Sequence, residues 1–203
     1  MNKLDRDFYL RDALTVAKSL LGKHLVHETQ DFKVIGRIVE TEAYVGPEDR
    51  ACHAYGWRRT KRNEVMYNEG GFSYVYFIYG MYYCFNVVTE QKDMPSAVLV
   101  RAVEPVEGME HMARLRYGAE LSALSNRQRS GMCNGPGKLC MSMGIGKAEN
   151  GLDLCGSILY ICDASNEHFS VKASPRINID YAGEYKDKPW RFCIEGNKYV
   201  SKG

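Results

Sequence analysis

The sequence lacks several features that would place it in common protein classes. No apolar run approaches the roughly 18 residues of a membrane-spanning helix, and residues 1–11 are too charged for a signal peptide. The formal net charge is only +2, so composition alone does not indicate a nucleic-acid-binding protein. We therefore expect a cytoplasmic protein that does not associate with membranes.

The cysteines and histidines do not form a pattern that would bind a metal. The chain contains 7 cysteines, an odd number, and no C-x-x-C motif. Its 5 histidines are scattered, and no H-E-x-x-H motif is present. We therefore expect reduced cysteines, no disulfide framework, and no metal or other cofactor.

The length and the hydrophobic pattern indicate one α+β domain. A chain of 203 residues with 45% hydrophobic content can bury one sizeable core, and no repeat or linker divides residues 1–203. Apolar residues at helical spacing predict helices, and alternating or β-branched runs predict strands. The predicted helices cover residues 12–21, 105–116 and 134–143, and the predicted strands cover 25–26, 34–39, 72–78, 81–88, 97–103, 158–162, 170–171, 177–179, 191–194 and 199–200.

Residues 38–44 carry the most unusual pattern in the chain. The segment reads IVETEAY, a β-branched start followed by two acidic residues and a tyrosine. Because side chains alternate between the faces of a strand, Glu40, Glu42 and Tyr44 share one side. Two acids on one face of a buried strand need either ion-pair partners or a chemical role, and this fragment leaves both interpretations open. The candidate ion-pair partners are Arg37, Arg58 and Arg59.

Residues 46–68 form a polar loop in which basic and aromatic residues are interleaved. Cations suit phosphates and rings suit bases, so this composition is compatible with a nucleic-acid surface. The alternative is a solvated loop whose aromatic side chains fold back onto the core. The basic residues are Arg50, Arg58, Arg59, Lys61 and Arg62, and the interleaved aromatic residues are His53, Tyr55 and Trp57.

Residues 72–88 predict a β-hairpin. Two β-prone runs flank Tyr79-Gly80, where glycine supplies the positive φ of a tight turn. Tyr79 would then lie at an exposed tip, where an aromatic side chain can act as a wedge between base pairs. In the alternative, the strand continues through Gly80 and Tyr79 packs in the core. Asn86, within the second run, is either a satisfied core amide or a recognition group.

Together these segments resemble the alkyladenine (3-methyladenine) DNA glycosylase family. The ordered blocks run from about residue 14 to the C-terminus, and the compact form is similar to bacterial members. The resemblance implies a single compact α+β domain with a curved, mostly antiparallel β-sheet flanked by helices and a protruding β-hairpin. The matching blocks are residues 36–44, 46–49 with His53, 74–86, 101–105, 135–139 and 182–184.

The resemblance implies a catalytic group within residues 38–44. Glu42 matches the general base, which deprotonates a water for attack at C1′ of the flipped nucleotide. Arg101 and the backbone carbonyl of Ile177 match groups that help to hold this water, and Glu40 is expected to support the site. No lysine stands where a Schiff base would be expected, so we expect a monofunctional enzyme without strand-cleaving activity.

The resemblance also implies a base pocket. Tyr44 and His53 match one wall, and Tyr76 matches the opposite wall. Asn86 matches a residue that disfavours normal guanine by crowding its exocyclic amino group. Tyr79 matches the wedge that fills the gap left by the flipped base. The residues that could approach the DNA backbone are Arg58, Arg59, Lys61 and Arg62.

These roles predict a DNA glycosylase that starts base excision repair. Its partner would be double-stranded DNA containing alkylated or deaminated purines, and we expect a nucleoid-associated monomer. The alternative is a protein that flips and holds damaged bases without cutting them. Such a binding protein would need Tyr44, Tyr76 and Tyr79 but not Glu42.

Overall fold

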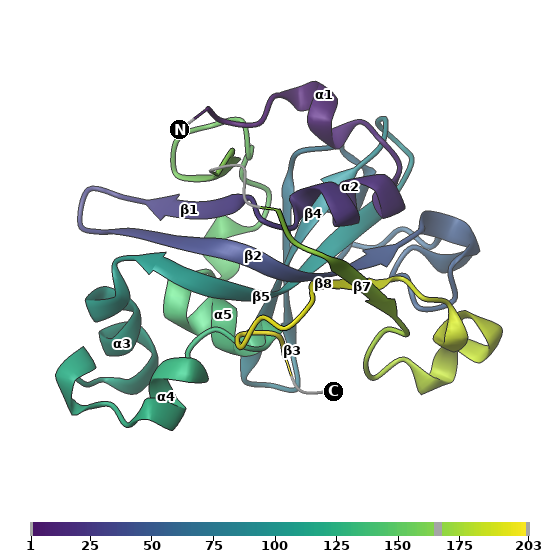
Figure 1. The fold of residues 1–203 in the computed structure, drawn as a ribbon. Helices are drawn as coiled ribbons and strands as arrows, with labels where there is room; N and C mark the ends of the chain where they lie inside the picture. Colours follow the sequence, from purple (N-terminus) through teal and green to yellow (C-terminus); the bar gives the residue numbers. More distant parts are fainter. Residues whose placement is uncertain (1, 165–167, 202–203) are drawn as a thin grey trace.

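The fold is organised around one antiparallel β-sheet (Figure 1). The computed structural model describes residues 2–164 and 168–201, and the rest of the expected domain 1–203 lies outside the described part. The sheet runs in the order β3-β4-β5-β2-β1-β6, with β8 beside β2 and β7 beside β8, and it curls into a half-barrel. The strands are β1 (His24–Glu28), β2 (Lys33–Tyr44), β3 (Ser73–Ile78), β4 (Tyr82–Thr89), β5 (Ser96–Glu107), β6 (Leu159–Cys162), β7 (Val171–Ser174) and β8 (Arg191–Ile194).

Strand β2 is central because it pairs with three neighbours. Strand β5 pairs along one edge. On the other edge, residues 33–37 of β2 pair with β1 and residues 40–42 pair with β8. The ladder with β5 shifts register between Ile35 and Gly36 and again on both sides of Glu40. Register shifts of this kind bend a strand and increase its twist, which agrees with the curl of the sheet.

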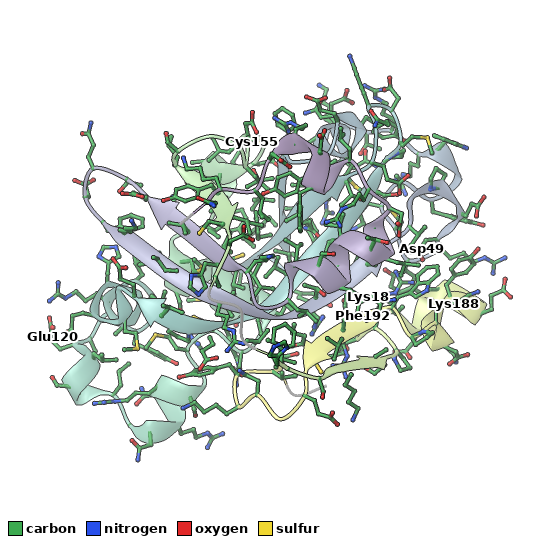
Figure 2. The ribbon with its side chains drawn as sticks, turned by 45° about the horizontal axis from the view of Figure 1, so that its top comes forward. Lys18, Asp49, Glu120, Cys155, Lys188 and Phe192 are labelled. Carbon is green, nitrogen blue, oxygen red and sulfur yellow. The ribbon has the colours of Figure 1, made fainter. Side chains whose placement is uncertain are left out.

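Short helices pack against this sheet. Thr41 of β2 donates a hydrogen bond to the carbonyl of Ala17 in α2 at 2.9 Å. Lys18 of α2 lies 5.1 Å from the ring centroid of Phe192 in β8 (Figure 2). Because strand side chains alternate, α2 covers the face opposite to Glu42. The α-helices are α1 (Arg6–Tyr9), α2 (Ala13–Leu20), α3 (Met109–Tyr117), α4 (Asn126–Ser130) and α5 (Pro136–Met143), and the 3₁₀ segments are η1 (Gly46–Glu48), η2 (Tyr55–Trp57), η3 (Glu64–Tyr67), η4 (Leu121–Ala123), η5 (Lys147–Glu149) and η6 (Asp180–Asp187).

The expected α+β class with a curved antiparallel sheet is confirmed, but three predicted elements differ. The helix predicted over 105–116 begins only at Met109, because β5 extends to Glu107 and Gly108 adopts a φ of 78°. Residues 177–179 and 199–200, predicted as strands, are not extended strands. Asn178 has a φ of 59°, which an extended chain does not tolerate.

The predicted hairpin is present, and Tyr79 lies at its tip. The backbone N–H of Met81 donates to the carbonyl of Ile78 at 3.2 Å and closes the turn between β3 and β4. Tyr79 and Gly80 both have positive φ, 54° and 68°, as in the tight turns that match the twist of a hairpin. Tyr79 is 73% exposed, so the alternative in which it packs in the core is wrong.

In the described part of the chain the cysteines are not joined by disulfides, and six of the seven are buried. Burial raises the pKa of Cys52 to about 12 and that of Cys84 to about 11, so both thiols are protonated at neutral pH.

None of the helices in residues 2–164 and 168–201 has the length and the apolar sequence that crossing a membrane would need.

Gly36 allows β2 and β5 to approach each other closely. A Cβ atom at this position would lie 2.5 Å from Cγ2 and 2.8 Å from Cβ of Val103. Carbon atoms do not approach this closely, so a side chain here would push the two strands apart. The close approach holds β5, which carries Arg101, beside the acidic segment of β2.

We expect Gly36→Ala to lower the free energy of unfolding by about 1–3 kcal/mol, because the added methyl group overpacks against Val103. Val103→Ala removes the clashing methyl groups. The two losses should therefore not add, and the double variant should be more stable than their sum predicts. Urea unfolding followed by circular dichroism measures all three variants, and additive losses would contradict this packing.

Candidate active site

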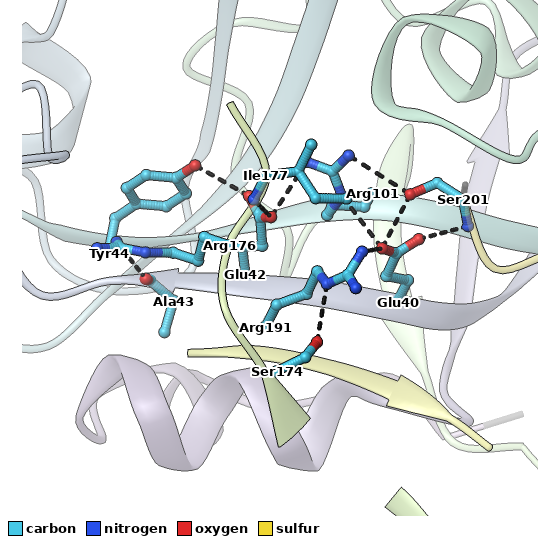
Figure 3. A network of polar contacts seen from close by, with 10 residues as sticks. All are labelled: Glu40, Glu42, Ala43, Tyr44, Arg101, Ser174, Arg176, Ile177, Arg191 and Ser201. Atoms are coloured by element: carbon cyan, nitrogen blue, oxygen red, sulfur yellow. Dashed lines mark hydrogen bonds and ion pairs between the residues drawn. The ribbon is translucent and has the colours of Figure 1, made fainter. Parts of the chain in front are cut away.

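The Glu42 carboxylate lies at a junction of three segments (Figure 3). The residue has no exposed surface. Its Oε1 accepts a hydrogen bond from the backbone N–H of Ile177 at 2.8 Å and lies 3.2 Å from Nη1 of Arg101. Its Oε2 accepts a hydrogen bond from the hydroxyl of Tyr44 at 3.0 Å. The network therefore joins β2, β5 and the chain around residue 177.

Glu40 is equally buried but is held by a different set of groups. Its Oε1 lies 3.2 Å from Nε of Arg101 and 3.3 Å from Nη1 of Arg191. Ser201 donates two hydrogen bonds to Glu40, from its backbone N–H to Oε2 at 2.7 Å and from its hydroxyl to Oε1 at 2.9 Å. Both acids thus have arginine partners, but these are not the three arginines considered from the sequence.

Arg101 bridges the two carboxylates and is itself only 7% exposed. Burial acts to lower the pKa of Arg101, but the negative charges of Glu42 and Glu40 outweigh it and raise the pKa above its ordinary value. The guanidinium therefore stays charged. A buried carboxylate is tolerated only with such a charged and hydrogen-bonded partner.

A second buried ion pair holds the chain that carries Ile177. Nη1 and Nη2 of Arg176 lie 2.5 and 2.8 Å from the carboxylate of Asp49, and neither side chain is exposed. Nη1 also donates to the carbonyl of Ala43 at 2.9 Å, and the guanidinium lies 4.7 Å from the ring centroid of Tyr44. This pair could not be predicted from the sequence, because no local pattern relates position 49 to position 176.

A cavity of about 280 Å³ opens beside this network; we call it the aromatic cavity. Tyr44, Arg101 and Ile177, which contact the Glu42 carboxylate, all line it. The lining brings together the expected pocket and wedge residues Tyr44, His53, Tyr76, Asn86 and Tyr79. It also contains residues that the sequence analysis did not single out, among them Tyr74, Tyr82, Pro136, Gly137, Asn178 and Tyr181.

His53 contacts two tyrosines of β3 within the lining of the aromatic cavity. The ring centroids of His53 and Tyr76 lie 4.7 Å apart, edge to face. The hydroxyl of Tyr74 lies 2.8 Å from Nδ1 of His53. Tyr74 could have been found from its two-residue spacing to Tyr76, which puts both rings on one face of the strand. Asn86 donates from Nδ2 to the carbonyl of Tyr74 at 3.0 Å, so it is a satisfied amide that also lines the cavity.

The four basic residues considered for DNA contact have different surroundings. The Arg59 guanidinium forms ion pairs with Glu64 at 2.6 Å and with Asp93 at 3.2 Å. The remaining three belong to the same exposed loop. Arg62 donates to the carbonyl of Phe77 at 3.1 Å and lies 5.2 Å from the ring centroid of Tyr76. Arg58 and Lys61 are exposed.

The chain matches known proteins over nearly its whole length. A sequence profile described as methylpurine-DNA glycosylase matches residues 7–198. The chain belongs to the methylpurine-DNA glycosylase family. A protein of Desulfitobacterium hafniense (strain Y51) is 55% identical over 201 residues, which cover 99% of each chain. A protein of Clostridium novyi (strain NT) is 53% identical over 202 residues, which cover 100% of each chain. Both relatives are provisionally named 3-methyladenine DNA glycosylase.

Membership of the methylpurine-DNA glycosylase family confirms the resemblance drawn from the sequence. It also confirms the expected enzyme class, a hydrolase of N-glycosyl bonds. In the described part of the chain, no group of three or more His, Cys, Asp or Glu side chains could hold a metal ion.

His53 is held in its neutral form within the cavity wall of this methylpurine-DNA glycosylase family member. Burial of the ring, together with the charges of Arg62 and Arg58, lowers the pKa of His53 to about 4, although the residue keeps an exposed side. An unperturbed histidine titrates near pH ~6.5. Between these two pH values the unfolded chain binds more protons, so His53 lowers the stability of the fold as the pH falls through this window.

We expect an NMR titration of the histidine rings to give a pKa of about 4 for His53. Arg58→Gln should raise this pKa, because one opposing cation is removed. Arg59→Gln is the matched control and should leave it unchanged, because Glu64 and Asp93 already neutralise that guanidinium. A wild-type pKa at or above ~6.5 would contradict the packing described for this ring.

Proposed function

We propose that this protein is a monofunctional DNA glycosylase that extrudes an alkylated or deaminated purine from duplex DNA into the aromatic cavity. Glu42 then activates a water that hydrolyses the N-glycosidic bond, which starts base excision repair. The observation that carries the proposal is the buried Glu42 carboxylate, whose partners Tyr44, Arg101 and Ile177 all line the cavity. We further propose that the protein acts as a monomer at the nucleoid.

The aromatic lining supports base extrusion on energetic grounds. An enzyme cannot reach C1′ of a stacked nucleotide, and extruding one costs a few kcal/mol. Stacking on aromatic side chains returns about 1–3 kcal/mol for each base. Burial raises the pKa of Tyr44 and Tyr76 well above the ordinary value, so both rings stay uncharged. A purine methylated at N3 or N7 carries a positive charge, and uncharged electron-rich rings attract it by cation–π interaction.

We assign the role of general base to Glu42. In the proposed step, a water loses its proton to the Glu42 carboxylate while its oxygen attacks C1′, and the bond electrons leave with the purine. The same carboxylate stabilises the positive charge that develops on the sugar. The backbone N–H of Ile177 donates a hydrogen bond to Glu42, so residue 177 lies beside this carboxylate. We therefore assign the carbonyl oxygen of Ile177 and the Arg101 guanidinium to holding the water.

The lining of the aromatic cavity supports a hydrolytic rather than a lyase reaction. A Schiff base to the sugar needs an amine, and no lysine is among the described residues that line the cavity. Without this amine, the proposed reaction ends with base release and leaves the DNA strand intact.

We assign one further residue to recognition of the extruded base and another to filling the gap that the base leaves in the duplex. Asn86 is 4% exposed in the cavity and fixed by its bond to Tyr74, so we propose that it crowds the exocyclic amino group of normal guanine. Tyr79 stands at the hairpin tip, so we propose that its ring fills the space vacated in the duplex.

We assign contacts with the DNA backbone to the exposed basic loop. Arg58 and Arg62 line a hollow that His53 shares with the aromatic cavity, and Lys61 is an exposed residue of the same loop. Arg59 is the weakest of the four candidates, because a phosphate contact would require it to leave Glu64 and Asp93. Contacts of this kind position the duplex but do not read its sequence.

We expect Glu42→Gln to lower base release by at least about 10²–10⁴-fold, because the variant cannot accept the proton of the attacking water. Duplexes containing hypoxanthine and methylated DNA serve as substrates, with a chelator present. Glu48→Gln is the matched control, since Glu48 is an exposed acid in the following loop, and it should retain the wild-type rate. Binding of the lesion duplex should be retained in both variants.

Two outcomes of this experiment would reject the proposal. Full activity of Glu42→Gln would mean that another group activates the water. Tight lesion binding without base release by the wild-type protein would mean that the chain holds damaged bases without cutting them.

We expect Tyr79→Ala to weaken binding of the lesion duplex by about 1–3 kcal/mol, because the gap left by the base is no longer filled. The measurement uses the Glu42→Gln protein, so that the base is not released, and 2-aminopurine opposite the lesion reports stacking in the gap. Leu115→Ala removes an exposed apolar side chain from α3 that does not line the cavity. This control should bind as before, and an equal effect of both substitutions would contradict the wedge.

A further inference from the structure

Asn178, an exposed residue in the lining of the aromatic cavity, has a backbone conformation that side chains rarely adopt. Its φ is 59°, in the left-handed region, where a Cβ atom crowds a backbone carbonyl oxygen. Among the described residues that line this cavity, only Asn178 and Tyr79 combine a side chain with a positive φ. A hairpin turn accounts for Tyr79, whereas Asn178 lies outside any helix or strand.

The side chain of Asn178 does not account for this conformation. Asparagine enters the left-handed region most readily when its amide forms a hydrogen bond with the nearby backbone. In the part of the chain that the structure describes, the amide of Asn178 forms no hydrogen bond. The positive φ is therefore imposed by the contacts that fix the chain on either side.

Both neighbours of Asn178 are fixed by contacts with other segments. On the N-terminal side, Arg176 is held in the buried ion pair described above, and the backbone N–H of Ile177 donates to Glu42 at 2.8 Å. On the C-terminal side, Ile179 is only 3% exposed. A strained residue persists only where its surroundings determine its conformation, and such residues concentrate at active sites.

The φ of Asn178 sets the direction of the peptide group that joins it to Ile177. This group is planar, so rotation about the N–Cα bond of Asn178 turns the Ile177 carbonyl as one unit. With residue 179 fixed, a negative φ would turn this carbonyl away or pull the Ile177 N–H from Glu42. None of the described residues donates a hydrogen bond to the Ile177 carbonyl oxygen, so it is able to accept one from a water.

We propose that Asn178 is a positioning residue of the active site, whose left-handed backbone aims the Ile177 carbonyl at the attacking water while the Ile177 N–H holds the Glu42 carboxylate. One bend of the chain thus places the proposed base and a partner of its water together. The inference rests on the proposed function, which assigns that carbonyl to the water. It requires the backbone conformation of residue 178 and not the amide group.

Substitutions at position 178 separate the backbone from the side chain in single-turnover base release from hypoxanthine duplexes and methylated DNA. We expect Asn178→Gly to keep a rate close to that of the wild type, because glycine adopts a positive φ without strain. Asn178→Val should lower the rate by about 10²-fold, because a β-branched residue is excluded from this region and a small displacement in an active site costs this much. Asn178→Ala should fall between them. Binding of the lesion duplex, measured with Glu42→Gln added, should change far less than the rate.

Glu90→Val is the matched control for backbone strain. Glu90 has a φ of 70° directly after β4, and it does not line the aromatic cavity. This variant should lower the thermal stability as Asn178→Val does, but it should leave base release unchanged. An equal loss of release in both variants would mean that instability is the cause and would overturn the proposal.

The NMR resonance of the Ile177 amide gives a readout that does not depend on activity. Because this N–H donates to a carboxylate, Glu42→Gln should shift its proton resonance in the otherwise wild-type protein. The same shift should appear when Asn178→Gly is present and should be largely lost when Asn178→Val is present. A full response in the valine protein would overturn the proposal.

The remaining outcomes distinguish this inference from the function on which it rests. Equal losses of release in Asn178→Gly and Asn178→Ala would assign the effect to the amide and overturn the backbone role. Base release by the wild type with no loss in Asn178→Val would overturn the inference and leave the glycosylase proposal standing. No release by the wild type would reject the glycosylase proposal, and the Ile177 resonance would still decide whether residue 178 holds this peptide against Glu42.

Discussion

Two carboxylates buried two residues apart on one strand repel each other, and much of the structure is arranged around neutralising Glu40 and Glu42. Removing one partner from such a buried ion network leaves an uncompensated charge, at a cost of about 3–5 kcal/mol. The partners come from β5, from β8, from the chain around residue 177 and from Ser201 (Figure 3). Neutralisation of these two charges therefore requires segments from the whole length of the chain to meet.

The network also separates the two acids by role. Glu40 shares Arg101 with Glu42, but its other partners, Arg191 and Ser201, are not among the residues that line the aromatic cavity. Glu42 is bonded to groups that themselves line that cavity. The strand alternation that places both acids on one face therefore gives two buried carboxylates with different partners, and we propose the chemistry only for Glu42. The distinction lies in the partners, since the two residues are chemically equivalent.

The local sequence pattern was sufficient to predict the structure where the interactions that determine it are local. Strand alternation placed Glu40, Glu42 and Tyr44 together, and the glycine at position 80 located the hairpin tip. The local pattern predicted the wrong element where a contact with a distant segment determines the structure. Residue 105 was predicted to begin a helix, but β5 continues through Pro105 because it pairs with Gly36 of β2. Arg58 and Arg59 are identical neighbours in sequence, yet only Arg59 is neutralised, by acids that the loop brings to it. The family resemblance supplied the roles that no local pattern contains.

The basic loop also acts electrostatically on the aromatic cavity through His53. A protonated imidazole would oppose a cationic methylated purine in the same cavity, whereas a neutral ring adds an uncharged aromatic wall. Burial and the charges of Arg62 and Arg58 lower the pKa of His53 and keep it neutral. A phosphate bound by these arginines would offset part of their field, while burial of the ring would remain. Arg58 and Arg62 thus serve the uncharged character of the proposed base site as well as the proposed contact with the DNA backbone.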